Sequence, residues 1–124
     1  MAAGGLSLVP RGVEPRVLEM TRRIVRDAQA EGHPVTHVWG YNPSPLSDHR
    51  NRRCVDLMVK NRTDGDWILG YLRRHEEELH IRYVIWWERQ WRDYHKPGVK
   101  WHRLARYFGA HRHRDHLHVE FDAA

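Results

Sequence analysis

Near its C-terminal end the chain contains the segment His113-Arg114-Asp115-His116-Leu117-His118-Val119-Glu120-Phe121. Residues two apart in a β-strand point to the same side of a sheet. The apolar residues of this segment would therefore share one face, whereas His116 and His118 would share the opposite face. This alternation predicts a strand over 117–121 that buries one side and presents two imidazoles on the other.

A second segment with the same division lies far upstream and reads Ser47-Asp48-His49-Arg50-Asn51-Arg52-Arg53-Cys54-Val55-Asp56-Leu57-Met58. In a strand over 53–60, Val55 and Leu57 would point to one side and Asp56 to the other. His49 would reach the same region from the preceding loop. Two such strands suit a metal held by two His and one Asp, with one coordination position left open. The alternative is a solvated strand face in a histidine-rich tail.

The overall composition fits one small basic domain. The chain has 124 residues, of which 40% are hydrophobic, and a formal net charge of +5 with a pI of about 9.8. This length and apolar content suit a single core. The positive charge favours anionic partners, such as nucleic acid, a membrane surface or a charged cell wall. The lone Cys54 cannot form an internal disulfide, so we expect a small buried residue.

The remaining periodicity predicts an α+β fold, with about two helices on one face of a small, mostly antiparallel sheet. Residues 91–110 are expected to be irregular, with at most one helical turn near 101–108. We expect residues 1–13 to be a flexible N-terminal arm and residues 14–124 to form a single domain. Helices are predicted over 15–31 and 67–80, and strands over 35–39, 53–60, 81–87 and 117–121.

Membrane spans and export signals have recognisable apolar patterns. No segment approaches the about 18 apolar residues of a membrane span, and the N-terminus lacks the pattern of a signal peptide. We therefore expect no membrane insertion and no export by the general secretory pathway.

Together, the two polar segments resemble motifs of the zinc peptidases that share the hedgehog and D-alanyl-D-alanine peptidase fold. The first family motif is Ser-x-His-x-x-Gly-x-Ala-x-Asp, and Ser47, His49 and Asp56 match it. Arg52 replaces the family's Gly, which predicts a different turn there, and Cys54 replaces its Ala. The second motif is a late His-x-His, matched by residues 116–118. Residues 83–86, Trp91 and residues 113–119 are also similar to a branch found in actinobacterial secreted proteins and phage lysins. The resemblance as a whole covers about residues 15–122.

This resemblance implies a zinc site and a role for individual residues. His49, Asp56 and His118 would hold the zinc ion (Zn2+). His116 would be the catalytic base or the donor that stabilises the tetrahedral intermediate. Asp115 is a second catalytic candidate, or it orients a neighbouring imidazole. The expected substrate-binding residues are Arg50, Arg53, Trp86 and His113.

The activity that the resemblance implies is hydrolysis of peptide bonds in bacterial peptidoglycan, either in stem peptides or in cross-links, by an endopeptidase or a carboxypeptidase. The expected partner is peptidoglycan, with no nucleic acid bound and the protein a monomer. Delivery to the cell wall is expected through phage lysis machinery or a virion, as an endolysin or lytic module. A place within a longer secreted protein fits equally well.

Two other functions stay open on the sequence. Residues 116–118 also satisfy the His-hydrophobe-His motif of metal-dependent endonucleases that nick single strands. Tyr94 or Tyr107 would then supply the nucleophile, although both precede the motif. The second alternative is a catalytically inactive module that binds the cell wall, and the replacement at Arg52 is the feature that suggests it.

Overall fold

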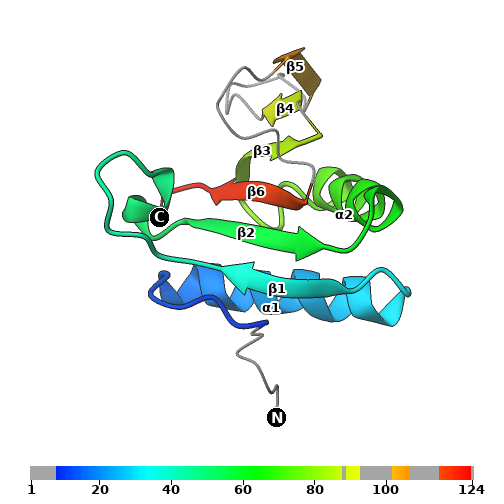
Figure 1. Ribbon diagram of the computed structural model, residues 1–124, viewed down its shortest axis with the longest axis horizontal. Coiled ribbons are helices and arrows are strands. Elements are labelled where there is room, and N and C mark those ends of the chain that lie inside the picture. The colour runs from blue at the N-terminus through cyan, green and yellow to red at the C-terminus, as the bar shows by residue number, and fades with distance from the viewer. Residues whose placement is uncertain (1–7, 88, 93–101, 107–114, 124) are drawn as a thin grey trace.

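The computed structural model describes residues 8–87, 89–92, 102–106 and 115–123 (Figure 1). No helix within these ranges is long and apolar enough to cross a membrane. The described residues form α-helices α1 (Pro15–Ala30) and α2 (Arg62–Arg74), the short 3-10 helix η2 (Asp48–Asn51), and strands β1 (Val35–Trp39), β2 (Cys54–Val59), β3 (Ile81–Trp86), β4 (Arg89–Arg92), β5 (His102–Arg106) and β6 (His116–Phe121).

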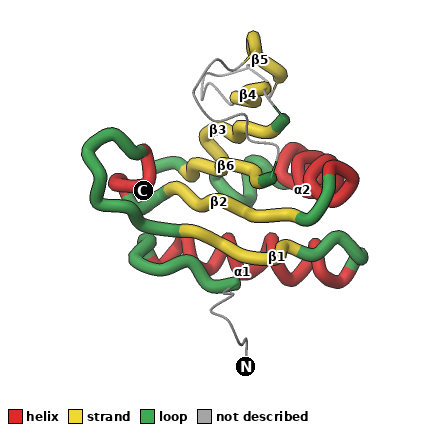
Figure 2. Tube along the Cα trace, in the orientation of Figure 1, coloured by secondary structure: helices red, strands yellow, loops and turns green. Residues whose placement is uncertain are grey.

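The strands of the described residues form one antiparallel sheet in the order β1-β2-β6-β3-β4-β5. The last strand of the chain, β6, lies between β2 and β3 (Figure 1). Both α-helices lie on the same side of this sheet, behind it in the view of Figure 2. The expected α+β class is therefore confirmed.

The core lies between the sheet and the two helices. Val55 pairs with Val119 and Leu57 with Leu117 across β2 and β6, and all four side chains are fully buried. They belong to one apolar cluster with residues of both helices. Because strand side chains alternate, the intervening pair of Asp56 and His118 points to the face without helices. The buried side chains that α1 and α2 contribute are Val17, Ile24, Val25, Ala28, Ile68, Leu69, Tyr71 and Leu72.

Two parts of the chain differ from the predicted elements. Helix α2 begins at Arg62 rather than at residue 67, because the Asn61 side chain accepts the N–H of Asp64 and caps the helix. It ends at Arg74 rather than at residue 80. The region predicted to be irregular contains β4 and β5, which pair with each other and extend the sheet beyond β3. Residues 102–106 are a strand, so a helical turn there is excluded.

The described part of the N-terminal segment packs against the domain instead of forming a loose arm. The N–H of Tyr41 donates to the carbonyl oxygen of Arg11 at 2.8 Å, and Val13 contacts the core. Gly40 permits this approach, because a Cβ there would lie 2.5 Å from the carbonyl oxygen of Arg11. Residues before the predicted boundary at residue 14 therefore contact the domain.

Gly65 of α2 packs directly against the ring of Trp86. A Cβ at Gly65 would lie 2.1 Å from Cζ2 of Trp86, whose side chain is buried in the core. We expect Gly65→Ala to destabilise the fold by about 1–3 kcal/mol, because the ring has no room to withdraw. Gly70→Ala in the same helix should instead stabilise it by about 0.5–1 kcal/mol, since a Cβ there meets only the end of Arg74 at 3.4 Å. Urea unfolding measures both, and shifts of the same sign would contradict this packing.

Candidate metal centre

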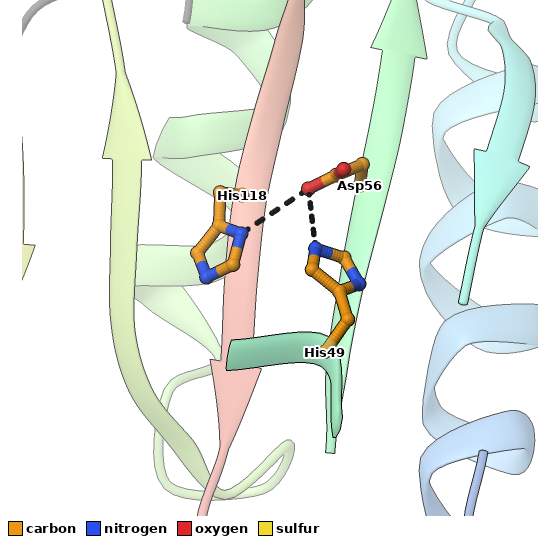
Figure 3. A group of neighbouring side chains, drawn as sticks. All are labelled: His49, Asp56 and His118. Carbon is orange, nitrogen blue, oxygen red and sulfur yellow. Dashed lines mark hydrogen bonds and ion pairs between the residues drawn. The ribbon is translucent and has the colours of Figure 1, made fainter. Parts of the chain in front are cut away.

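Three side chains from separate elements converge on the face of the sheet opposite the helices (Figure 3). His49 comes from η2, Asp56 from β2 and His118 from β6. Their ligand atoms all lie within 4.8 Å of one another. Oδ1 of Asp56 is 3.1 Å from Nε2 of His49 and 3.2 Å from Nδ1 of His118. This group could hold a metal ion, as the sequence predicted.

The chemistry of the three donors fits a divalent metal of the kind that imidazole and carboxylate bind. Both histidines are buried and Asp56 is half-buried, so each ligand atom is held in place. Burial opposes ionisation of Asp56, but hydrogen bonds from His118 and His49 outweigh it and hold the pKa of its carboxyl well below the usual range. The carboxylate is thus ionised and ready to bind a cation. Three protein ligands leave a fourth position open, as in catalytic zinc sites.

The first motif positions His49 through two local contacts. The side chain of Ser47 accepts the backbone N–H of His49 at 3.2 Å and caps η2. The Nδ1–H of the His49 ring donates to the carbonyl oxygen of Gly40 at 2.8 Å, which leaves Nε2 facing Asp56. Burial by itself would lower the pKa of His49, but the hydrogen bond and charge of Asp56 raise it above its ordinary value. Both contacts fix the ring orientation before a metal binds.

The two predicted catalytic residues lie beside this group. Nε2 of His116 is 3.6 Å from Oδ1 of Asp56, and Nδ1 of His116 is 2.8 Å from Oδ1 of Asp115. His116 is buried and Asp115 is exposed. With Nδ1–H donated to Asp115, Nε2 of His116 faces the metal ligands. The carboxylate of Asp115 thus contacts the ring nitrogen of His116 that lies away from the metal ligands.

A family model described as "VldE, C-terminal domain" matches residues 10–116, which is most of the chain. The chain belongs to this family. The match includes His49, Asp56 and His116 and ends before His118. Comparisons with curated proteins and with solved structures gave no match.

Two of the residues predicted to bind substrate lie on the side of the sheet that the helices cover. Arg53 points to the side opposite Asp56, toward the helices, where its Nη1 is 3.8 Å from Oε2 of Glu14. Trp86 packs in the core, and its Nε1–H donates to Oδ1 of Asp66 at 2.9 Å. Both predictions are wrong, because the side chains of Arg53 and Trp86 point away from the face that carries the metal ligands. Arg50 is exposed on η2 beside His49.

Three other residues named from the sequence cannot be placed. His113, predicted to bind substrate, and the alternative nucleophiles Tyr94 and Tyr107 lie outside the described residues.

Two residues beside the centre were not predicted from the sequence. Tyr83 stacks on the ring of His118 with 5.6 Å between ring centroids. Trp39 is the cross-strand partner of Asp56 and is 58% exposed. Strand alternation predicts which side chains share a face with Tyr83 or Trp39 within each strand. Only the observed strand order shows that these two side chains lie next to the metal ligands.

Arg52 keeps a backbone conformation that favours glycine, although its sequence predicted a different turn. Its φ is 64°, in the left-handed region, which costs a non-glycine residue about 1–2 kcal/mol. Two contacts offset this cost. The guanidinium lies 3.9 Å from the centroid of the Tyr41 ring, and its Nη1–H donates to the carbonyl oxygen of Gly12 at 2.8 Å. The turn that positions His49 is therefore compatible with arginine.

Two substitutions separate the backbone cost at Arg52 from its side-chain contacts. Arg52→Ala keeps the left-handed φ and loses the contacts, so it should destabilise the protein by about 1–2 kcal/mol. Arg52→Gly loses the same contacts but relieves the backbone, and it should be about 1 kcal/mol more stable than the alanine variant. Chemical unfolding of the two variants measures this difference. Equal stabilities would show that the turn carries no backbone cost.

Proposed function

We propose that the protein is a zinc-dependent peptidase that hydrolyses peptide bonds in bacterial peptidoglycan, in stem peptides or in cross-links. The observation that carries the proposal is the group of His49, Asp56 and His118, with the imidazole of His116 beside it. Such a site combines a metal with an open position and a base, which is what hydrolysis of an amide requires. The motif resemblance to D-alanyl-D-alanine peptidases supplies the substrate class.

Each residue of the centre has a distinct role in this proposal. Zinc held by His49, Asp56 and His118 would act as a Lewis acid on the scissile carbonyl and lower the pKa of the attacking water toward about 7. His116 would serve through Nε2 as the general base and then as the general acid that protonates the leaving amine. Asp115 keeps the Nδ1–H of His116 in place, so that Nε2 stays directed at the substrate.

The charge of the protein supports a cell-wall substrate. Stem peptides carry free carboxylates, and arginine binds carboxylates through paired N–H donors. Arg50 is exposed on the short helix that also carries His49, so it is the candidate for holding such a group. The net charge of +5 favours approach to an anionic wall. Delivery would occur through phage lysis machinery, in a virion, or as part of a longer secreted protein.

Digestion of purified peptidoglycan tests this function. Zinc-loaded protein should release new free amines from the walls, and mass spectrometry of the fragments identifies the bond. Protein stripped with a chelator should release none until zinc is restored. A protein that binds zinc but releases no amines from walls would contradict the proposal. Nicked single-stranded DNA in a parallel reaction would favour the endonuclease, and neither reaction would favour a binding module.

A further inference from the structure

The ring of His118 is held from two opposite sides. Its Nδ1 is 3.2 Å from Oδ1 of Asp56, within the metal-binding group. Its Nε2 is 3.2 Å from the hydroxyl oxygen of Tyr83. The same hydroxyl donates to Oδ2 of Asp48 at 2.6 Å. A continuous chain of contacts therefore runs from the metal-binding group through His118 and Tyr83 to a carboxylate.

Only one arrangement of donors and acceptors in this series of hydrogen bonds leaves Nδ1 of His118 able to bind a metal. The carboxylate of Asp48 is an acceptor, so the hydroxyl of Tyr83 donates to it. The oxygen of Tyr83 then accepts the Nε2–H of His118. With a metal bound, His118 is a neutral imidazole that carries one proton. With that proton on Nε2, Nδ1 offers its lone pair to the metal on the side where Asp56 lies.

We propose that Tyr83 and Asp48 form a positioning pair that holds His118 in the tautomer and ring orientation that bind the metal. The pair also links the elements that carry two of the ligands. Asp48 precedes His49 on η2, and Tyr83 lies on β3, next to the strand of His118. Stacking between the rings of Tyr83 and His118 adds a second restraint on orientation. This proposal rests on the metal centre but not on the identity of the substrate.

Zinc affinity tests the pair independently of any hydrolysis. Partners that orient a ligand contribute about 10- to 100-fold to metal affinity, so Tyr83→Phe should weaken zinc binding by about that factor, measured by competition with a chromophoric chelator. Tyr71→Phe is the matched control: its hydroxyl also donates to a carboxylate at 2.6 Å, that of Asp27, but between the two helices. This control should leave zinc affinity unchanged.

Two further measurements separate positioning from a general effect on the fold. Asp48→Ala should weaken zinc binding in the same direction, and its side chain is 63% exposed, so the fold should tolerate the change. In the zinc-bound protein, the Nε2–H proton of His118 should exchange slowly with solvent, because the hydroxyl of Tyr83 accepts it, and it should exchange faster in Tyr83→Phe.

Three results would overturn the positioning pair. The first is folded Tyr83→Phe and Asp48→Ala proteins that bind zinc as tightly as the parent. The second is an Nε2–H proton of His118 that exchanges equally fast in the zinc-bound parent and in zinc-bound Tyr83→Phe. The third is a parent protein that binds no zinc, which would remove the centre as well. Loss of zinc affinity in Tyr83→Phe without any wall digestion by the parent would instead support the pair and reject the peptidase.

Discussion

Replacing His118 with alanine should remove both zinc binding and hydrolysis. His118 offers one of three ligand atoms that lie within 4.8 Å of one another, and its Nδ1 is 3.2 Å from Oδ1 of Asp56. Two ligands cannot hold the ion as three do. We expect zinc affinity to fall by more than the about 10- to 100-fold typical of outer partners. Elemental analysis after dialysis should find about one zinc per parent chain and essentially none in the variant.

The control for this loss is another histidine that leaves the centre intact. His75 caps the C-terminal end of α2 and its ring contacts Glu78, so His75→Ala should keep full zinc occupancy and wall digestion. Circular dichroism should show the same secondary structure for both variants. Full zinc occupancy in His118→Ala would mean that His118 is not a ligand.

Replacing His116 with alanine should separate metal binding from turnover. Its Nε2 is farther from Oδ1 of Asp56 than the ligand atoms of His49 and His118 are, at 3.6 Å against 3.1 and 3.2 Å. We therefore expect His116→Ala to keep its zinc and to lower kcat by about 10²- to 10⁴-fold, which is the usual contribution of a general base.

A substitution of the neighbouring Asp115 should have a smaller effect on kcat than the loss of His116. Asp115→Asn keeps an oxygen that can accept the Nδ1–H of His116, so its kcat should fall less than that of His116→Ala. Loss of zinc from His116→Ala would identify His116 as a ligand instead of a base. Unchanged kcat in that variant would leave it with no part in the reaction.

Strand alternation predicted the main features of the fold and of the metal centre. The two faces of β2 and β6 follow from Val55, Asp56, Leu117 and His118, because each strand has one apolar and one polar side. The same rule already placed Arg53 on the apolar face with Val55, so its predicted role at the site conflicted with the pattern. Alternation predicted that Trp86 and Ile85 point to opposite faces of the sheet. It did not predict which of these faces the helices cover.

The features that sequence could not predict depend on contacts between distant segments. Tyr83 reaches His118 only because β3 pairs with β6 in one particular register. The short strands β4 and β5 carry mostly charged and polar residues, so their strand character comes from pairing with β3 and with each other. The turn at Arg52 depends on Tyr41 and Gly12, which lie 11 and 40 residues away along the chain.

Anomalous diffraction from crystals soaked in zinc tests the central claim most directly. The account predicts a peak bonded to Nε2 of His49, Nδ1 of His118 and an oxygen of Asp56, at about 2.0–2.2 Å from each. Zinc bound only at other histidines, or no zinc within bonding distance of these three side chains, would contradict it.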